Sequence, residues 1–156
     1  MAGQQFLFSY DTIGDRTNAQ SGGDVNGLNL GSCALTPNAI DQYASRTVPA
    51  SFDLLGVAQA EAMVSIDGST NSVTRKGEYY HRPKGVANSS VAVWLTVTNT
   101  ATAGGSSSNV VGNVFTPKTP ENFTYDNDGN LTGDGRFSYS WDAENRLIRQ
   151  VVSRAK

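Results

Sequence analysis

The sequence predicts an all-β protein, and three observations support this class. Short runs rich in β-branched and aromatic residues alternate with turn-forming residues along most of the chain. The apolar spacing of an amphipathic helix does not persist beyond one turn, and the best helix candidate is Leu55 to Met63. A short motif of aromatic residues, Asp and Gly occurs three times, in the form typical of hairpin turns.

Composition limits the size of the fold and excludes several function classes. The 156 residues carry 12 Lys and Arg against 14 Asp and Glu, and 38% of them are hydrophobic. Such a near-neutral chain has no basic field for nucleic acid, and no apolar run approaches the roughly 20 residues of a membrane-spanning helix. A single cysteine, Cys33, cannot form an internal disulfide. We therefore expect one domain, or a small domain with flanking arms, that neither binds nucleic acid nor inserts into a membrane.

The repeated motif accounts for both ends of the chain. Its copies are Phe8 to Thr17, Phe123 to Thr132 and, more loosely, Tyr139 to Leu147. Each follows the order aromatic, polar, aromatic, Asp, two residues, then Gly or Asn. The two aromatic residues point to one face of a strand, the Asp bonds to its own backbone, and Gly or Asn accepts a positive φ. Each copy therefore predicts the corner of a β-hairpin. The matched positions, all with structural roles, are Tyr10, Asp11, Gly14, Tyr125, Asp126, Gly129, Trp141 and Asp142.

These copies resemble the YD repeats of the rearrangement-hotspot (Rhs) family of large bacterial surface and toxin proteins. Leu35 to Tyr43 looks like the other half of such a repeat, with Asp41 where the second Asn usually stands. In the third copy Trp141 replaces the usual Tyr and Asn145 the usual Gly, so we expect a looser turn there. The resemblance implies a cell-surface or secreted location, as part of a larger bacterial protein, and a role in a scaffold of repeated hairpins.

The middle of the chain, from about 48 to 116, changes to short β-type runs at sandwich-like spacing. Gly104 to Ser108 is expected to be a loop between two of them. The segment resembles the small bacterial immunoglobulin-like module, similar to a glucodextranase accessory domain, on the motifs Val64 to Gly68, Arg75 to Tyr80 and Val93 to Val97. The expected architecture is therefore an immunoglobulin-like β-sandwich flanked by YD-repeat β-hairpins, with segments 1–47, 48–116 and 117–156.

The two flanking segments are expected to meet. Because the ends of a domain often lie close together, we expect Phe6 to Tyr10 beside Phe123 to Tyr125 or Phe137 to Trp141 in one small sheet. Strand edges left open at the outer sides recruit other chains, so a homo-oligomer is one expected outcome. The expected partners are the rest of a larger YD-repeat chain and, in second place, a polysaccharide.

Trp94 is the candidate binding residue. Alternation in Val91 to Thr98 sets its ring on the polar side of the strand, away from the aliphatic residues. Two interpretations stay open: a flanking repeat strand covers the ring, or the ring is a stacking platform for a sugar. In the second interpretation the assisting residues are Tyr79, Tyr80, Glu78, His81 and Arg82.

An acidic turn is the candidate for a metal. Asp126, Asp128 and Asn130 offer side-chain oxygen atoms of the kind that calcium binds. The segment fails as an EF-hand, because the sixth residue from Asp126 is Leu131 instead of Gly and the twelfth is Phe137 instead of Glu. We favour a structural turn without a cofactor, with weak calcium binding as the alternative.

The sequence supports no catalytic centre. His81 is the only imidazole, it lies in the charged run Arg75 to Lys84, and we expect it at the surface. No Gly-x-Ser-x-Gly motif occurs, no pair of carboxylates stands out by spacing, and Cys33 has no basic neighbour to activate it. The leading hypothesis is therefore a non-enzymatic structural scaffold, the alternative is a carbohydrate-binding module, and a hydrolase is the remote third.

Overall fold

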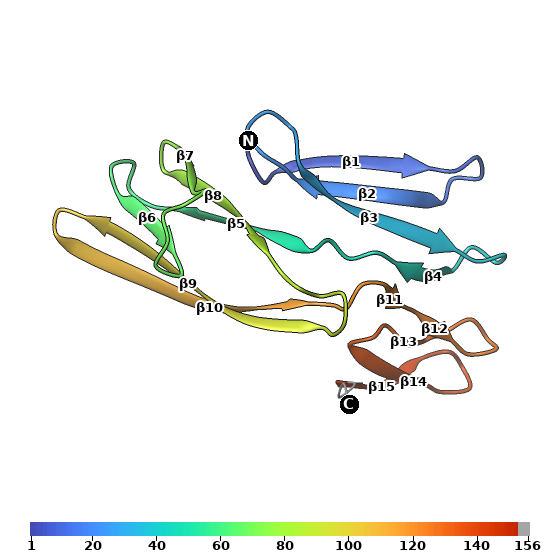
Figure 1. Ribbon diagram of the computed structural model, residues 1–156. Helices are drawn as coiled ribbons and strands as arrows, with labels where there is room; N and C mark the ends of the chain where they lie inside the picture. Colours follow the sequence, from blue (N-terminus) through green and yellow to red (C-terminus); the bar gives the residue numbers. More distant parts are fainter. Residues whose placement is uncertain (153–156) are drawn as a thin grey trace.

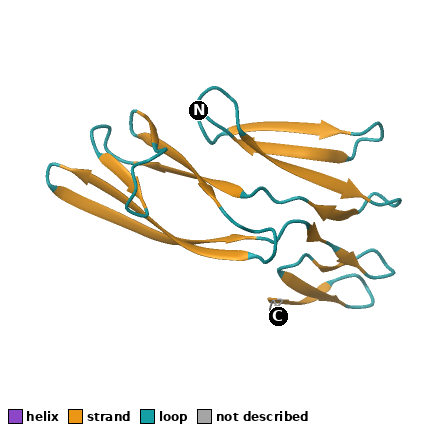
Figure 2. Ribbon diagram, in the orientation of Figure 1, coloured by secondary structure: helices purple, strands orange, loops and turns teal. Residues whose placement is uncertain are grey.

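The computed structural model describes residues 1–152, and in that range every regular element is a β-strand (Figures 1 and 2). The all-β class is confirmed. The helix candidate Leu55 to Met63 is wrong, because its first residues complete a strand that pairs with a neighbour over its full length. The strands are β1 (Gln5–Tyr10), β2 (Arg16–Gly22), β3 (Leu30–Pro37), β4 (Tyr43–Arg46), β5 (Ser51–Val57), β6 (Met63–Ile66), β7 (Thr74–Lys76), β8 (Tyr79–Gly85), β9 (Val93–Ala103), β10 (Ser106–Thr116), β11 (Glu121–Asn122), β12 (Thr124–Tyr125), β13 (Leu131–Gly133), β14 (Phe137–Trp141) and β15 (Leu147–Val152).

The strands form four antiparallel sheets. One has the order β1-β2-β3-β4-β11, and a second has the order β12-β13-β14-β15. These two contain the residues of the predicted repeats. The other two, β5-β8-β7 and β10-β9-β6, are built from the middle of the chain.

The first two sheets meet along the segment that runs from β11 into β12. On one side of it, Glu121 lies opposite Arg46 of β4, and the Phe123 amide donates to the Ala44 carbonyl at 2.9 Å. On the other side, β12 pairs with β13. The strands β1 to β4 and β11 to β15 are therefore joined through one segment, and we call them the repeat sheet.

The two flanking segments meet, but not through the strand that the sequence indicated. Phe6 to Tyr10 lies in β1 and pairs with β2, whereas β4 is the strand that meets β11. The expectation for β1 was wrong for a topological reason. Consecutive hairpins place each strand beside its predecessor, so the first strand stays at the outer edge and the strands that border the insertion become neighbours.

Residues 48–119 leave the repeat sheet after β4 and return to it at β11, and we call them the inserted unit. Figure 1 shows its strands extending away from the repeat sheet. The Arg82 guanidinium in β8 donates to the carbonyl of Ile66 in β6 at 2.7 Å and so joins the two small sheets. Ile66 (0% exposed) and Val97 (2% exposed) are the most buried apolar residues of this sandwich-like pair. The expected loop at Gly104 is a tight turn between β9 and β10.

Candidate functional site: a row of hairpin turns

Four hairpins of the repeat sheet turn through the same five-residue loop. The first residue is Asp or Asn, and its amide donates to the carbonyl four residues later. Its Oδ1 accepts from the amides two and four residues on, at 2.8 to 3.1 Å. Figure 1 shows the four tips on the same side of the repeat sheet. We call these loops the Asx turns, and their first residues are Asp11, Asn38, Asp126 and Asp142.

The fourth residue of each Asx turn has a positive φ. Gly14 and Gly129 fill this position in the first and third turns, with φ of 103° and 86°. Asp41 and Asn145, each with φ of 59°, fill it in the second and fourth. Asn and Asp tolerate this conformation better than other side chains do. The looser turn expected at Asn145 is therefore not observed, since its turn keeps the backbone hydrogen bonds of the others.

Each Asx turn sits on the same β-bulge. The residue before the Asx pairs with the fifth residue after it, but the preceding residue pairs with the seventh, so one residue is left unpaired. The turn, the positive φ and the bulge together give four hairpins of one local geometry. The pairs next to the turns are Tyr10 with Arg16, Pro37 with Tyr43, Tyr125 with Leu131 and Trp141 with Leu147.

Sequence reasoning missed two turn centres. Asp24 begins a loop with the same hydrogen bonds, and Gly27 at its fourth position has a φ of 80°. This loop joins β2 to β3 at the end of β2 that is remote from the Asx turns. Its Asp-x-x-Gly spacing is visible in the sequence, but no aromatic residue precedes Asp24. Asn38 was missed because Asn replaces Asp and Pro37 replaces the aromatic residue.

Neighbouring Asx turns contact one another. Burial raises the pKa of the Asp15 carboxyl in the first turn, and Asp41 of the second turn lies close enough for its charge to raise this pKa further. Gln42 Nε2 of the second turn donates to the Gly129 carbonyl of the third at 3.1 Å. In each contact the side chain of the last residue of a turn reaches the fourth residue of the next turn. In the third contact, Asn130 Nδ2 of the third turn donates to Asn145 Oδ1 of the fourth at 2.8 Å. The four turns thus form one row, and this row is the candidate functional site.

The aromatic residue before the Asp binds the preceding hairpin. The Tyr125 hydroxyl donates to the Tyr43 carbonyl at 2.9 Å, and Trp141 Nε1 donates to the Leu131 carbonyl at 2.7 Å. Both acceptors are the fifth residue after the Asx of the preceding turn. Tyr and Trp each present an apolar ring and one polar group, so both can make this contact. The tyrosine of the motif therefore ties one hairpin to the next.

The surroundings of the carboxyl groups in the row shift their pKa values. The Asn130 amide lowers the pKa of Asp126, and the Arg146 amide and guanidinium lower the pKa of Asp142. Burial, with the Asp41 charge second, raises the pKa of Asp15.

The candidate calcium ligands serve the third turn itself. Asp126 Oδ1 accepts from the amides of Asp128 and Asn130, and Oδ2 accepts from Asn130 Nδ2 at 3.2 Å. Within residues 1–152, no group of three or more His, Cys, Asp or Glu is placed to hold a metal ion. The loop is closed by its own donors, which supports the structural role of these three residues.

The structure separates the aromatic residues of the predicted sugar platform. Tyr79 and Tyr80 follow one another in β8, so their side chains point to opposite faces of the sheet. Tyr80 lines a hollow beside Thr100 of β9. Thr100 is six residues from Trp94, which corresponds to about 20 Å along a strand. These three rings therefore do not form one platform.

Trp94 lies instead beside the fourth hairpin. The Arg136 guanidinium carbon is 5.7 Å from the centre of the Trp94 ring, 4.6 Å from Phe115 and 4.9 Å from Phe137. These are cation–π distances, so a repeat residue contacts the ring. Trp94 is nevertheless 61% exposed. The flanking repeat thus touches the ring without covering it.

The polar residues proposed to assist Trp94 lie elsewhere in the inserted unit. Arg82 donates to the carbonyls of Ile66 and Ser69 between the two small sheets. Glu78 is exposed in the turn between β7 and β8. Neither side chain is brought together with Trp94.

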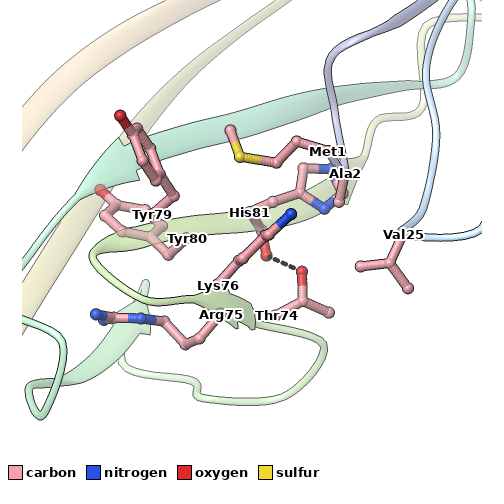
Figure 3. A pocket seen from close by; sticks show the side chains of 9 residues that line it. All are labelled: Met1, Ala2, Val25, Thr74, Arg75, Lys76, Tyr79, Tyr80 and His81. Atoms are coloured by element: carbon pink, nitrogen blue, oxygen red, sulfur yellow. Dashed lines mark hydrogen bonds between the residues drawn. The ribbon is translucent and has the colours of Figure 1, made fainter.

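His81 is buried, which corrects the expected surface position. Its side chain points from β8 toward the first residues of the chain (Figure 3), and a Cβ on Gly3 would lie 2.6 Å from its Cδ2. Nε2 of the ring is 2.5 Å from Asp53 Oδ1, and Nδ1 has no partner among residues 1–152. The nearby Thr74 hydroxyl donates to the His81 carbonyl at 3.2 Å and not to the ring (Figure 3). The pair therefore lacks the hydroxyl or thiol nucleophile of a catalytic triad within the described residues.

Comparisons with known proteins identify no relative, because no family model, no curated protein and no solved structure matches the chain. Among residues 1–152, no helix is long and apolar enough to span a membrane.

Proposed function

We propose that the protein is a non-enzymatic structural scaffold, in which the repeat sheet holds the inserted unit in place. The observation that carries this proposal is the row of four Asx turns. Each turn is closed by its own side chain, and hydrogen bonds join the second turn to the third and the third to the fourth, so these hairpins are joined at their tips as well as along their strands. A row of this kind provides rigidity without a ligand.

The root of the inserted unit supports the same proposal. Glu121 in β11 is only 6% exposed and lies 2.5 Å from the Arg46 guanidinium in β4. Close by, the Val48 amide donates to Thr119 Oγ1 at 3.0 Å. The two chain segments that lead into the inserted unit are therefore fixed to each other as well as to the sheet.

We further propose that the chain belongs with the YD-repeat proteins of the Rhs family, at the bacterial surface or secreted, with an immunoglobulin-like inserted module. Support comes from the aromatic-Asp-x-x-Gly motif and from the contacts that its aromatic residue and its Asp make. In this proposal the partners of the chain are neighbouring repeats of a larger protein.

Removing one bond between hairpins should test the scaffold function. In the Tyr125→Phe variant the ring remains, but the hydroxyl bond to the Tyr43 carbonyl is lost. A buried hydrogen bond contributes about 1 kcal/mol, so we expect roughly fivefold faster amide exchange in the second and third hairpins together. Native-state hydrogen exchange with residue resolution measures this effect.

Tyr79→Phe is the matched control, because Tyr79 is exposed and lies outside the repeat sheet. It should leave exchange in the Asx turns unchanged. If Tyr125→Phe accelerates exchange only in its own hairpin, the hairpins are independent of one another and the scaffold proposal fails.

A carbohydrate-binding module is the second candidate function, favoured by the exposed ring of Trp94. Phe115 and Arg136 border this ring and would add an apolar wall and a donor for a sugar hydroxyl. Trp141 is partly buried and bonded to a carbonyl, so its fluorescence should respond little to a ligand at Trp94.

Fluorescence titration with a panel of soluble polysaccharides should test this second function. If sugars stack on the ring, quenching saturates in the wild type and in Tyr79→Ala and vanishes in Trp94→Ala. A flat response across the panel, or equal loss in both variants, would leave the scaffold as the single proposed function.

A further inference from the structure

The two outer strands of the repeat sheet each have one open edge. Within residues 1–152, β1 pairs only with β2 and β15 pairs only with β14. Five of the six residues of β1 and all six of β15 are exposed. Neither strand contains the Pro residues that block many natural edges, and Arg149 is the single charged residue in the two strands.

The three junctions inside the repeat sheet share one register. At each junction, the seventh residue after the Asx of one hairpin lies opposite the fourth residue before the Asx of the next. The rule therefore holds on both sides of the inserted unit. The three pairs are Asn18 with Ala34, Ser45 with Asn122, and Gly133 with Ser138.

Two further contacts accompany this register. At the second and third junctions the residue before the Asx, Tyr125 or Trp141, donates from its side chain to the carbonyl five residues after the preceding Asx, whereas Pro37 at the first junction has no donor. At the second and third junctions, the last residue of one turn donates a hydrogen bond to the fourth residue of the next turn, and at the first junction Asp15 lies near Asp41 in the same two positions. Together with the register, these contacts define what an additional hairpin must offer.

The open edges carry the two halves of such a junction. Applied to β15, the register places Arg149 opposite Leu7 of an added β1. The hydroxyl of Tyr10, the residue before Asp11, then meets the carbonyl of Leu147, five residues after Asp142. Arg146, the last residue of the fourth turn, meets Gly14, the fourth residue of the first. The strand directions also agree, because neighbouring strands of the repeat sheet alternate in direction. The β1 strand of an added copy therefore runs antiparallel to β15.

We propose that a second copy of this chain docks its β1 against β15, head to tail, in the register of the internal junctions. The proposal rests on the scaffold function, because it treats the hairpins as units that add to a continuing sheet. The occupant is a second copy because the chain itself supplies both halves of the contact. A head-to-tail contact does not close on itself, so it adds further copies as the concentration rises.

Two proline variants can block the two edges separately. In the third hairpin the amide of Phe123, three residues before the Asx, points to the preceding hairpin. Phe8 has the same position in the first hairpin, so Phe8→Pro removes an outward amide and leaves the pairing with β2 intact. Gln150 has the position in the fourth hairpin that Arg46 has in the second. Arg46 lies opposite Glu121, two residues before Phe123, so its amide also points to the neighbouring hairpin. Gln150→Pro therefore removes an outward amide of β15.

Sedimentation velocity over about a hundredfold concentration range tests the proposal with the full chain. We expect the wild type to associate and each proline variant alone to associate at least about tenfold more weakly. An equimolar mixture of the two variants should form a dimer and nothing larger, because each retains the edge that the other lacks. A monomeric wild type overturns the proposal, and so does self-association of either variant with the affinity of the wild type, which indicates pairing of identical edges.

Disulfide trapping tests the register. Asn122 and Ser45 lie next to the hydrogen-bonded Phe123 and Ala44, so they form a non-hydrogen-bonded pair. Leu7 and Arg149 have the corresponding positions at the proposed junction. Their Cα atoms are therefore expected about 4.5 Å apart, close enough for a disulfide. In a Cys33→Ser background, a mixture of Leu7→Cys and Arg149→Cys chains should form a covalent dimer upon mild oxidation. Phe8→Cys is the control for Leu7→Cys, because its side chain points to the other face and should not crosslink.

Folding controls keep the outcomes distinct. Circular dichroism of each variant must match the wild type, and exchange in the Asx turns must stay slow. If the turns remain protected while the wild type stays monomeric, the docking proposal fails and the scaffold function stands. If the turns exchange as independent hairpins, the scaffold function itself fails.

Discussion

The Ile66→Ala variant is expected to lose about 3 kcal/mol of its free energy of unfolding, because removing a buried isoleucine forfeits transfer energy and leaves a cavity. Ile66 is 0% exposed, and only four other hydrophobic residues among residues 1–152 fall in the buried class. Such a small core has few neighbours that could shift into the space. Urea unfolding, followed by circular dichroism, measures the loss.

Ile13→Ala is the matched control for this prediction. Ile13 has the same side chain but is 74% exposed at the tip of the first hairpin, so its truncation should change the free energy of unfolding by less than about 0.5 kcal/mol. Similar losses at the two positions would mean that the inserted unit has no packed core around Ile66.

The Asx turns were largely predictable because their geometry is local. Asp126 and Gly129 fix their loop through bonds to residues four positions away at most, so five letters of sequence specify it. The same physics explains why Asn145 keeps the turn, since Asn provides the left-handed conformation that Gly usually supplies. Asn38 was missed only because the prediction required Asp and an aromatic residue before it.

Contacts between distant segments were not predictable from a single sequence. The bond from Gln42 to Gly129 joins turns that lie on either side of the inserted unit. No local pattern indicates that β4 and β11 become neighbours. His81 shows the same limit, because its burial depends on Gly3 and on a carboxyl group from β5, both remote in sequence. Charge around His81 predicted exposure, but the partners that remove it from water come from elsewhere.

The register of the sheet explains why the candidate site is a row and not a pocket. Each hairpin places its bulge at the same distance from the Asx, and each junction repeats one offset. Equal local geometry and equal offsets bring the tips to one side, where polar side chains of neighbouring turns meet. Trp94, in contrast, belongs to a strand without this repeat, and nothing in its own segment indicates that Arg136 lies beside it.

Asn88 holds the root of the inserted unit, and its replacement should have the second large effect. The side chain is 1% exposed, and Nδ2 donates to the Pro117 carbonyl at 2.9 Å, with the Val48 and Pro49 carbonyls at 3.5 Å. The backbone carbonyl of Asn88 accepts from the Thr119 amide at 2.9 Å. Asn88 therefore links the segment that enters the inserted unit to the segment that leaves it.

Asn88→Ala should cost about 2 kcal/mol at any pH, because it leaves buried carbonyls without a donor. Asn88→Asp has the same shape but places a carboxyl group against those carbonyls. An ionised carboxylate buried without a cation is strongly unfavourable, by about 3–5 kcal/mol, so its pKa in the folded state must rise above the unfolded value of about 3.9.

The sign of the pH dependence follows from that raised pKa. Between the unfolded and the folded pKa the native state binds more protons, so stability falls as the pH rises through this interval. Below about pH 4 the protonated carboxyl can donate to Pro117 in place of the amide, and Asn88→Asp should approach the wild type. Urea midpoints of both variants from acid to neutral pH measure this difference. If Asn88→Asp loses the same free energy of unfolding at every pH, water reaches the site, and the link that Asn88 forms between the two segments is open in solution.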